Sequence, residues 1–287
     1  MFGPRIGAPR TDVVSKTEVR TQADGFRAAT GAPKALVKGL ALVEAVSAAG
    51  EPVPLSDLVR ASGLPRSTAL RLLEALCDWQ VLRLDRSLGY TLGPQLAVWG
   101  QQYLDGLDVR RQAEDLMHGL SAATRETCFL GVREHRQVLY VARVDGPQAV
   151  QPAARIGSRN PLHSTAIGKA LLAFGSPQAE REYLDGPLVR RTPNTITDAA
   201  RLADEIRVTR DRGYAIDDVE NEDGVRCVAA PVRDHTGEVV AAMSVSAPAY
   251  RFARSDLPQL APKVLAATAE LSARIGHRPH ATAREAQ

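Results

Sequence analysis

Four polar residues at the start of one short helical segment have side chains that could read DNA bases. The segment lies within residues 55–79, LSDLVRASGLPRSTALRLLEALCDW, and the candidate residues are Arg66, Ser67, Thr68 and Arg71. An arginine can hold a guanine through two hydrogen bonds, and a hydroxyl group can reach a base edge or a phosphate. Base contacts of this kind require that the side chains be held at one end of a rigid element.

The sequence around these residues is typical of two short helices joined by a tight turn. Gly63 suits the left-handed residue that closes a helix, and Pro65 cannot continue that helix. Hydroxyl groups at residues 66–68 can cap the free N–H groups of the second helix. One face of each helix is apolar, formed by Leu55, Leu58 and Val59 with Ser62 in the first, and by Ala69, Leu72, Leu73 and Leu76 in the second. The pattern predicts a helix-turn-helix, although it also fits an ordinary corner between two helices.

The flanking segments favour the DNA-binding interpretation. A helix is expected at residues 34–49, with a buried stripe at Leu36, Leu40 and Val43, joined by Val37 and Val46. After Trp79, the sequence VLRLDRSLGYTLG predicts a β-hairpin, which would be the wing of a winged helix-turn-helix. Arg86 lies in this hairpin and is expected to meet a phosphate or the minor groove.

Charge within this region argues for a few placed contacts. Residues 34–105 contain seven basic and seven acidic side chains, so their net charge is zero. A non-specific DNA clamp needs many phosphate contacts, whereas a site reader needs a few phosphate contacts and base contacts in addition. The sequence suits the site reader, because Arg60, Arg66 and Arg71 cluster around the second helix and Arg83 and Arg86 lie on the wing.

The totals place the chain among ordinary globular proteins. Its 287 residues suggest about two domains, and it is 44% hydrophobic and 24% charged, with a formal net charge of +3. The three cysteines, Cys77, Cys128 and Cys227, have neither a disulfide nor a zinc spacing and fit a reducing cytoplasm. There is no apolar run of about 18 residues and no apolar segment at the N-terminus, so secretion and membrane spanning are not expected.

The second half of the chain predicts an α+β domain with an antiparallel sheet. A helix at residues 94–104, with Leu96, Trp99, Gly100 and Tyr103 on one side, is expected to link the two halves. The expected helices are 109–125, with Leu116, Leu120 and Ala123 inward, then 164–173, 178–184, 199–212 and 256–275. The expected strands are 128–132, 138–143, 149–153, 214–219, 225–232 and 239–248, with a loop at 155–161.

Five sequence blocks together resemble the IclR family of bacterial transcription regulators. They are GLPRSTALRLLEAL and GYTLG in the first half, and NPLHSTAIGKALLA, RGYAIDDVENEDGVRCVAAPV and AAMSVSAP in the second. The resemblance covers residues 36–275. It implies a winged helix-turn-helix, a linker helix and an effector-binding domain with a GAF-like sheet. It also implies dimers, often paired into tetramers on DNA.

The resemblance further implies where an effector binds, between the PLHSTAIGKA segment and one face of the sheet. Ala166 and Ile167 align with family positions whose backbone meets the ligand, and Asp217 and Cys227 align with ligand-facing positions. Ser244 and Ser246 are two residues apart on a strand and therefore share a face. The N-terminus of a helix presents unpaired N–H groups that suit a carboxylate. Together with the hydroxyl groups, this suits a small organic acid.

Other interpretations of these residues remain open. Arg71 could instead form a helix-surface salt bridge with Glu74. Cys227 could pack in the core, and Asp217, Asp218 and Glu220 could form a solvated turn. His163 could contact a ligand or have a structural role at the start of a helix.

Three further hypotheses concern function. Cys227, His163 and Asp217 could be a nucleophile, a base and an orienting group, but Cys227 lies inside a predicted strand, where no helix N-terminus lowers its pKa. No His/Cys pair has metal-ligand spacing. Alternatively, the second domain could only mediate dimerisation.

We therefore expect a ligand-responsive DNA-binding regulator, with repression as its mode of action, located in the cytoplasm. Its partners would be double-stranded operator DNA, a small carboxylic acid and further copies of itself in a homodimer or homotetramer. No enzymatic activity, cofactor, metal or membrane contact is expected. The expected parts are an N-terminal extension (1–33), a winged helix-turn-helix (34–93), a linker helix (94–107), an effector-binding domain (108–276) and a tail (277–287).

Overall fold

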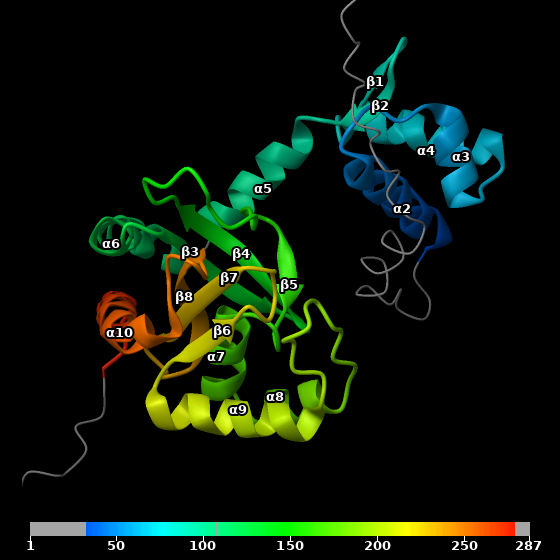
Figure 1. Ribbon diagram of the computed structural model, residues 1–287. Coiled ribbons are helices and arrows are strands. Elements are labelled where there is room, and N and C mark those ends of the chain that lie inside the picture. The colour runs from blue at the N-terminus through cyan, green and yellow to red at the C-terminus, as the bar shows by residue number, and fades with distance from the viewer. Residues whose placement is uncertain (1–32, 107, 279–287) are drawn as a thin grey trace, which may run out of the picture. The chain divides into compact units, whose positions relative to one another are not determined.

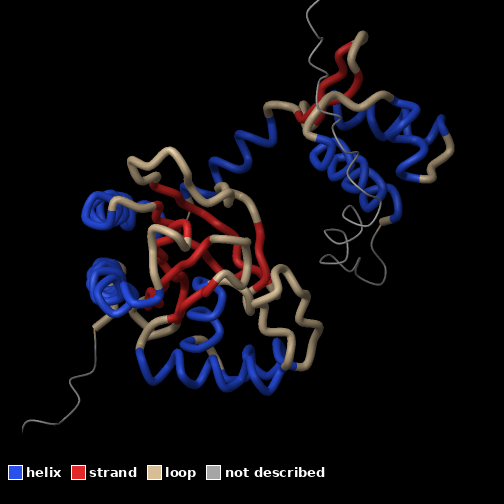
Figure 2. Tube along the Cα trace, in the orientation of Figure 1, coloured by secondary structure: helices blue, strands red, loops and turns tan. Residues whose placement is uncertain are grey.

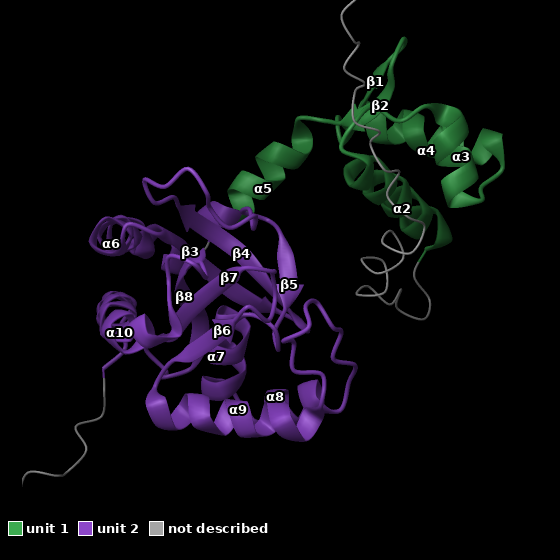
Figure 3. Cartoon of the chain, viewed as in Figure 1, with its two compact units in different colours: residues 1–103 green, residues 104–287 purple. Residues whose placement is uncertain are grey.

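A computed structural model of the protein describes residues 33–106 and 108–278. The chain forms two compact units, residues 1–103 and 104–287 (Figure 3). The expected N-terminal extension lies outside the described residues except for Pro33, as does most of the expected C-terminal tail. The sequence of this extension fits a solvated tail, although its basic residues could also touch phosphates, namely Arg5, Arg10, Lys16, Arg20 and Arg27.

The first unit contains the predicted helix-turn-helix and wing. Its elements are α2 (Lys34–Ala49), α3 (Leu55–Ser62), α4 (Arg66–Asp78), β1 (Leu82–Asp85), β2 (Gly89–Leu92) and most of α5 (Gln95–Asp105). Gly63 closes α3 with a φ of 64° and donates its N–H to the carbonyl of Val59. The wing is an antiparallel hairpin in which Leu84 pairs with Tyr90. The fold expected of this half is therefore confirmed.

The face of α2 that meets the core differs from the predicted stripe. Leu42 and Val46 are buried together with Leu58, Leu73, Leu82 and Tyr90. Leu36 and Leu40 are instead 59% and 56% exposed, and Val37 is also exposed, so burial of these three residues was predicted wrongly. A period of 3.6 residues identifies an apolar side of a helix, but this helix has apolar residues on two adjacent faces. The face with Gly39, Leu42 and Val46 is the one that packs.

The second unit is built on one six-stranded antiparallel sheet with helices on both faces (Figures 1 and 2). The strand order is β5-β4-β3-β8-β7-β6. The strands are β3 (Thr127–Glu134), β4 (Gln137–Val144), β5 (Arg159–Pro161), β6 (Ala215–Asp218), β7 (Val225–Arg233) and β8 (Val239–Pro248). The helices are α6 (Asp108–Thr124), α7 (Ala166–Phe174), α8 (Pro177–Leu184), α9 (Ala199–Arg212) and α10 (Leu257–Arg274), the last preceded by a 3-10 turn, η1 (Arg254–Asp256).

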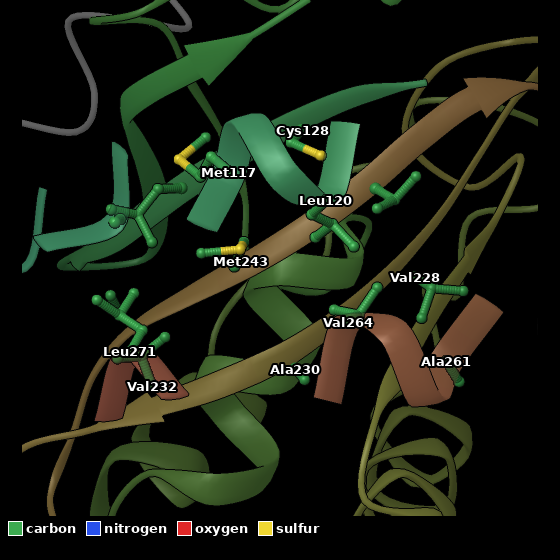
Figure 4. Packing of buried hydrophobic residues seen from close by; sticks show 14 of the residues in the cluster. Met117, Leu120, Cys128, Val228, Ala230, Val232, Met243, Ala261, Val264 and Leu271 are labelled. Atoms are coloured by element: carbon green, nitrogen blue, oxygen red, sulfur yellow. The ribbon is translucent and has the colours of Figure 1, made fainter. Parts of the chain in front are cut away.

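Alternate residues of the five longer strands, β3, β4, β6, β7 and β8, supply two separate cores. On one face α6 and α10 cover the sheet, with Met117, Val264 and Leu271 packed against Val228 and Met243 (Figure 4). On the other face lies α7, whose residues 166–173 are all buried, and α9 packs against the outside of α7. A helix that is apolar on all sides must be enclosed, so α7 lies inside the unit with its N-terminus close to the sheet.

Two predicted segments near this helix are wrong. Residues 149–153 form no strand, and two of their carbonyl groups accept hydrogen bonds from arginine side chains. Arg143 donates to the carbonyls of Pro152 and Ala154, and Arg251 donates to that of Val150. Residues 159–161, predicted to be loop, pair with β4 and form the edge strand β5.

Two smaller points concern the helices. Ala123, predicted to face inward on α6, is exposed near the end of that helix. Within the described residues, no helix is long and apolar enough to cross a membrane.

Gly168 in the first turn of α7 allows the closest backbone approach in this unit. A Cβ atom there would lie 2.6 Å from the carbonyl carbon of Leu162. We expect Gly168→Ala to lower the free energy of unfolding by about 2 kcal/mol or more, because the backbone of α7 must move away from this contact. Denaturant unfolding would measure the change.

Gly119→Ala is the matched control, because a Cβ at this position of α6 meets nothing within 4 Å. This variant should gain about 1 kcal/mol from the better helix propensity of alanine. Equal effects of the two substitutions would contradict the role given to the contact at Gly168.

Candidate functional site

The first candidate site is the exposed face at the start of α4. Arg66, Ser67 and Arg71 are exposed and Thr68 is half-buried, while Ala69 and Leu73 on the opposite face anchor the helix in the core. The residue before the helix is Pro65 and no side chain caps the N-terminus, so the expected capping by the hydroxyl groups is not found. These hydroxyl groups therefore stay available to an external partner.

The arginines of this face form no ion pair with the part of the chain that the structure describes. In residues 33–106, no hydrogen bond or ion pair is made by the side chains of Arg66 or Arg71, so the alternative pairing of Arg71 with Glu74 is absent. Arg60, by contrast, is paired with Asp57 at 2.9 Å. Arg86 is exposed in the wing, where the Asp85 carboxylate accepts the N–H groups of Ser87 and Leu88 and so shapes the turn.

The second candidate site is a pocket in the second unit, between the N-terminus of α7 and the sheet. It has about 360 Å³ of empty space, which includes open solvent at its mouth. All the residues expected at an effector site line it, namely Ala166, Ile167, Asp217, Cys227, Ser244 and Ser246. Residues from three separate blocks of the sequence are thus brought together at one place.

The polar wall of the pocket follows from strand register. Asp217 on β6 lies opposite Cys227 on β7, and Cys227 lies opposite Ser246 on β8. Directly paired residues of antiparallel strands point to the same face, so a carboxyl, a thiol and a hydroxyl group form one row across the sheet. Ser244, one pleat along, has its hydroxyl oxygen 3.5 Å from that of Ser246.

The N-terminus of α7 contributes hydrogen-bond donors and a partial positive charge to the pocket. Thr165 caps the helix by accepting the N–H of Gly168 at 3.0 Å. Within the described residues, the N–H groups of Ala166 and Ile167 have no acceptor. Two such N–H groups and the positive end of a nine-residue helix are features that favour an anion.

Several residues of this pocket could not be found from the sequence. The aromatic wall consists of Phe129 and Tyr140, whose ring centroids lie 5.2 Å apart in an edge-on contact. Pro152 belongs to the segment predicted to be a strand, and Ala154 directly follows that segment. Only the register of β3 with β8 places Phe129 beside Ser244. Thr165 could have been found, because a threonine before an apolar helix is a capping signal.

Asp217 is not part of a solvated turn. It is 2% exposed, and Glu220 in the same turn is 7% exposed. Burial and the nearby Glu220 carboxylate raise the pKa of Asp217 to about 7. The raised pKa favours the protonated form of Asp217, which places no negative charge in the pocket.

The arrangement of Cys227 and His163 does not fit a nucleophile and its base. Both ring nitrogens of His163 have other partners, with Nδ1 2.7 Å from the Tyr183 hydroxyl and Nε2 3.0 Å from the Val189 carbonyl. Burial, followed by the charge of Asp217, raises the pKa of the Cys227 thiol well above its usual value. His163 thus has a structural place outside the pocket lining, and Cys227 contributes a neutral thiol to it.

No group of three His, Cys, Asp or Glu side chains in residues 33–106 and 108–278 is arranged to hold a metal ion.

Ionisation of Asp217 has a predictable effect on stability. The carboxyl pKa rises from 3.8 in a free side chain to about 7 in the folded chain. Its contribution to stability is therefore complete below the unfolded pKa and is lost as the pH rises toward the folded one. We expect Asp217→Asn to gain stability relative to the wild type as the pH rises. The difference between their free energies of unfolding should be about 2 kcal/mol larger at pH 8 than at pH 5.

Denaturant unfolding across this pH range would test that expectation. Asp218→Asn is the control. Asp218 forms an ion pair with Arg226 at 2.7 Å, so replacing its carboxylate by an amide should lower the stability of the protein. A constant difference between Asp217→Asn and the wild type from pH 5 to pH 8 would show that Asp217 is already ionised at the lower pH.

Comparison with known proteins identifies relatives for both units of the chain. Residues 35–86 match the IclR helix-turn-helix domain, and residues 101–273 match the bacterial transcriptional regulator IclR C-terminal domain. The HTH-type transcriptional regulator KdgR of Escherichia coli is 33% identical over 230 residues, covering 79% of this chain and 88% of KdgR.

Two further relatives are informative. The HTH-type transcriptional repressor AllR of Salmonella typhimurium is 31% identical, covering 92% of this chain and 98% of AllR. The crystal structure of an IclR homologue complexed with 4-hydroxybenzoate, from Microbacterium hydrocarbonoxydans, superposes with a TM-score of 0.73 at 26% identity, covering 84% of this chain and 99% of that one. The chain belongs to the IclR family of bacterial transcriptional regulators and is a ligand-responsive, DNA-binding regulator.

Proposed function

We propose that the protein is a repressor that releases its operator in response to a small organic acid. The observation that carries this proposal is the pocket, where two free helix N–H groups face a row formed by a carboxyl, a thiol and a hydroxyl group. The repressor AllR and the 4-hydroxybenzoate-bound homologue support the mode of action and the acid, respectively.

The chemistry of the lining defines the proposed effector. Its carboxylate would accept the N–H groups of Ala166 and Ile167, since these have no other acceptor. Its other polar groups would bind Ser244, Ser246 and protonated Asp217. The rings of Phe129 and Tyr140 would contact its carbon atoms. A compact acid with a hydroxyl or keto group fits these contacts.

Operator binding is assigned to α4 and the wing. The recognition helix of a helix-turn-helix enters the major groove with its N-terminal residues at base edges. We assign base or phosphate contacts to Arg66, Ser67, Thr68 and Arg71, and a phosphate or minor-groove contact to Arg86. Their side chains are free to make such contacts.

The proposed coupling needs more than one copy of the chain. Half-sites of an operator have a fixed spacing, so a homodimer or homotetramer binds only when its helix-turn-helix units have the matching separation. An effector that binds better to another arrangement shifts the population away from DNA. We place this activity in the cytoplasm, where bacterial DNA is found.

Acid binding should depend on pH in a defined direction. Above a pH of about 7, Asp217 is ionised, so binding of an anion must be accompanied by uptake of a proton at Asp217. We expect the affinity for a carboxylate to fall as pH rises from 7 to 9, approaching tenfold per unit. The probes are 4-hydroxybenzoate and a panel of two- to six-carbon hydroxy and keto acids, screened by thermal shift and measured by calorimetry.

Asp217→Asn is the control for this dependence, because an amide does not titrate and the profile should become flat. Failure of every acid in the panel to raise the melting temperature would overturn the proposed effector class. It would favour a second unit that serves only for dimerisation.

Operator recognition can be tested with Arg71→Ala. DNA selected from a random pool by the wild-type protein supplies the operator. Loss of a bidentate guanine contact should weaken binding about fivefold or more, since such a contact contributes about 1–3 kcal/mol. Gel-shift titration would measure the change, with far-UV circular dichroism to verify the fold.

Arg60→Ala is the matched control, because Arg60 is an exposed arginine of the same unit that is already paired with Asp57. Its effect on operator affinity should be small. Equal affinities of Arg71→Ala and the wild type would remove Arg71 from the contact surface.

A further inference from the structure

The turn that carries Asp217 into the pocket has a strained backbone. It comprises residues 217–221, which include the last two residues of β6. Val219 in this turn has a φ of 60°. A β-branched residue rarely adopts this left-handed conformation, because its side chain collides with the backbone. Such a conformation persists only where neighbouring groups hold it in place.

Hydrogen bonds from the main chain of this turn fix Asp217. Its Oδ1 atom accepts the N–H of Glu220 at 2.7 Å and that of Asn221 at 3.4 Å. The position of the carboxyl group that faces the pocket therefore depends on where residues 220 and 221 lie.

Lys169 of α7 holds Glu220 from behind the pocket. Its ammonium group is 2.6 Å from Glu220 Oε1 and 3.5 Å from Glu205 of α9. The Lys169 side chain is 1% exposed. The carbonyl of Glu220 also accepts the hydroxyl of Thr195 at 2.6 Å. The turn is thus attached both to α7 and to the segment before α9.

The buried Lys169–Glu220 ion pair has an energetic cost, which indicates that stabilising the fold is not its main effect. The second oxygen of Glu220, Oε2, is buried and has no hydrogen-bond partner in the described chain. Removing two charges from water offsets much of their attraction, so a buried ion pair adds little net stability. The main effect of the Lys169–Glu220 pair is on geometry, because the pair fixes one conformation of a strained turn.

We propose that Lys169 and Glu220 are positioning residues of the effector pocket, whose buried ion pair holds the 217–221 turn so that Asp217 faces the ligand. The proposal rests on the proposed function of that pocket. It adds two residues outside the pocket lining and predicts that the pair becomes dispensable once the turn is free of strain.

The test replaces both charges together, with Lys169→Met and Glu220→Gln, so that no lone charge is left buried. In the full-length double variant, binding of the acid identified in the panel should weaken at least tenfold. The affinity of the empty protein for its operator should stay within twofold. Hydrogen exchange at the amides of Glu220 and Asn221 should accelerate, because their acceptor is no longer held.

Adding Val219→Gly to the double variant separates positioning from general support of the fold. Glycine adopts a φ of 60° without strain, so the turn should return to its place without the ion pair. Acid affinity and slow exchange should both be restored. Val219→Ala should restore neither, since alanine keeps its Cβ. The control pair is Arg207→Met with Asp211→Asn, which removes an exposed pair on α9 and should change nothing.

Each other result has a definite meaning. Wild-type acid affinity together with wild-type exchange in the double variant would overturn the proposal. If the double variant does not fold, Glu220→Gln alone keeps the size of the side chain, and unchanged exchange and affinity there would overturn it equally. If the wild type binds no acid, the proposed function fails, while the exchange rates still decide whether the pair holds the turn.

Discussion

The close contact between the first turn of α7 and the backbone of Leu162 is the constraint on which the pocket depends. It is possible only because residue 168 is glycine. The contact brings the free N–H groups of Ala166 and Ile167 near a sheet face that carries Asp217, Cys227 and Ser246. A helix N-terminus and a protonatable carboxyl group are then present on two sides of one small space. If the proposed effector binds there, its anionic group would be attracted by the helix N-terminus and would be tolerated beside Asp217 only while that carboxyl group is protonated.

Much of the fold was predictable because the strongest signals are local. The helix at residues 34–49 was predicted with its observed bounds, and Gly63 and Pro65 mark the turn before α4. The misplaced features depend on distant partners. Which side of α2 is buried is decided by Leu58, Leu73 and Tyr90. Residues 149–153 form no strand, and two of their carbonyl groups accept hydrogen bonds from Arg143 and Arg251.

The same distinction applies to the candidate site. The family resemblance pointed to Ala166, Ile167, Asp217 and Cys227, and the structure places them around one pocket, although their binding role stays a prediction. No local pattern reveals that Lys169 reaches Glu220, because 51 residues separate them. Both residues lie in blocks that carry the family resemblance, but only the coordinates show that they contact each other.

The loop at residues 145–158 differs from the other walls of the pocket in what holds it. At Val150, Pro152 and Ala154 it is held by arginine donors on its main-chain carbonyls, from Arg143 and Arg251, and these bonds do not depend on the side chains at those positions. The side chains of Asp145 and Gln151 also bind Arg143. The helix and strand walls, by contrast, are constrained by core packing. Substitutions in this loop can therefore alter the lining at Pro152 and Ala154 while the sheet stays intact. This loop is the natural place to redirect the regulator to a new metabolite and so to build a biosensor from it.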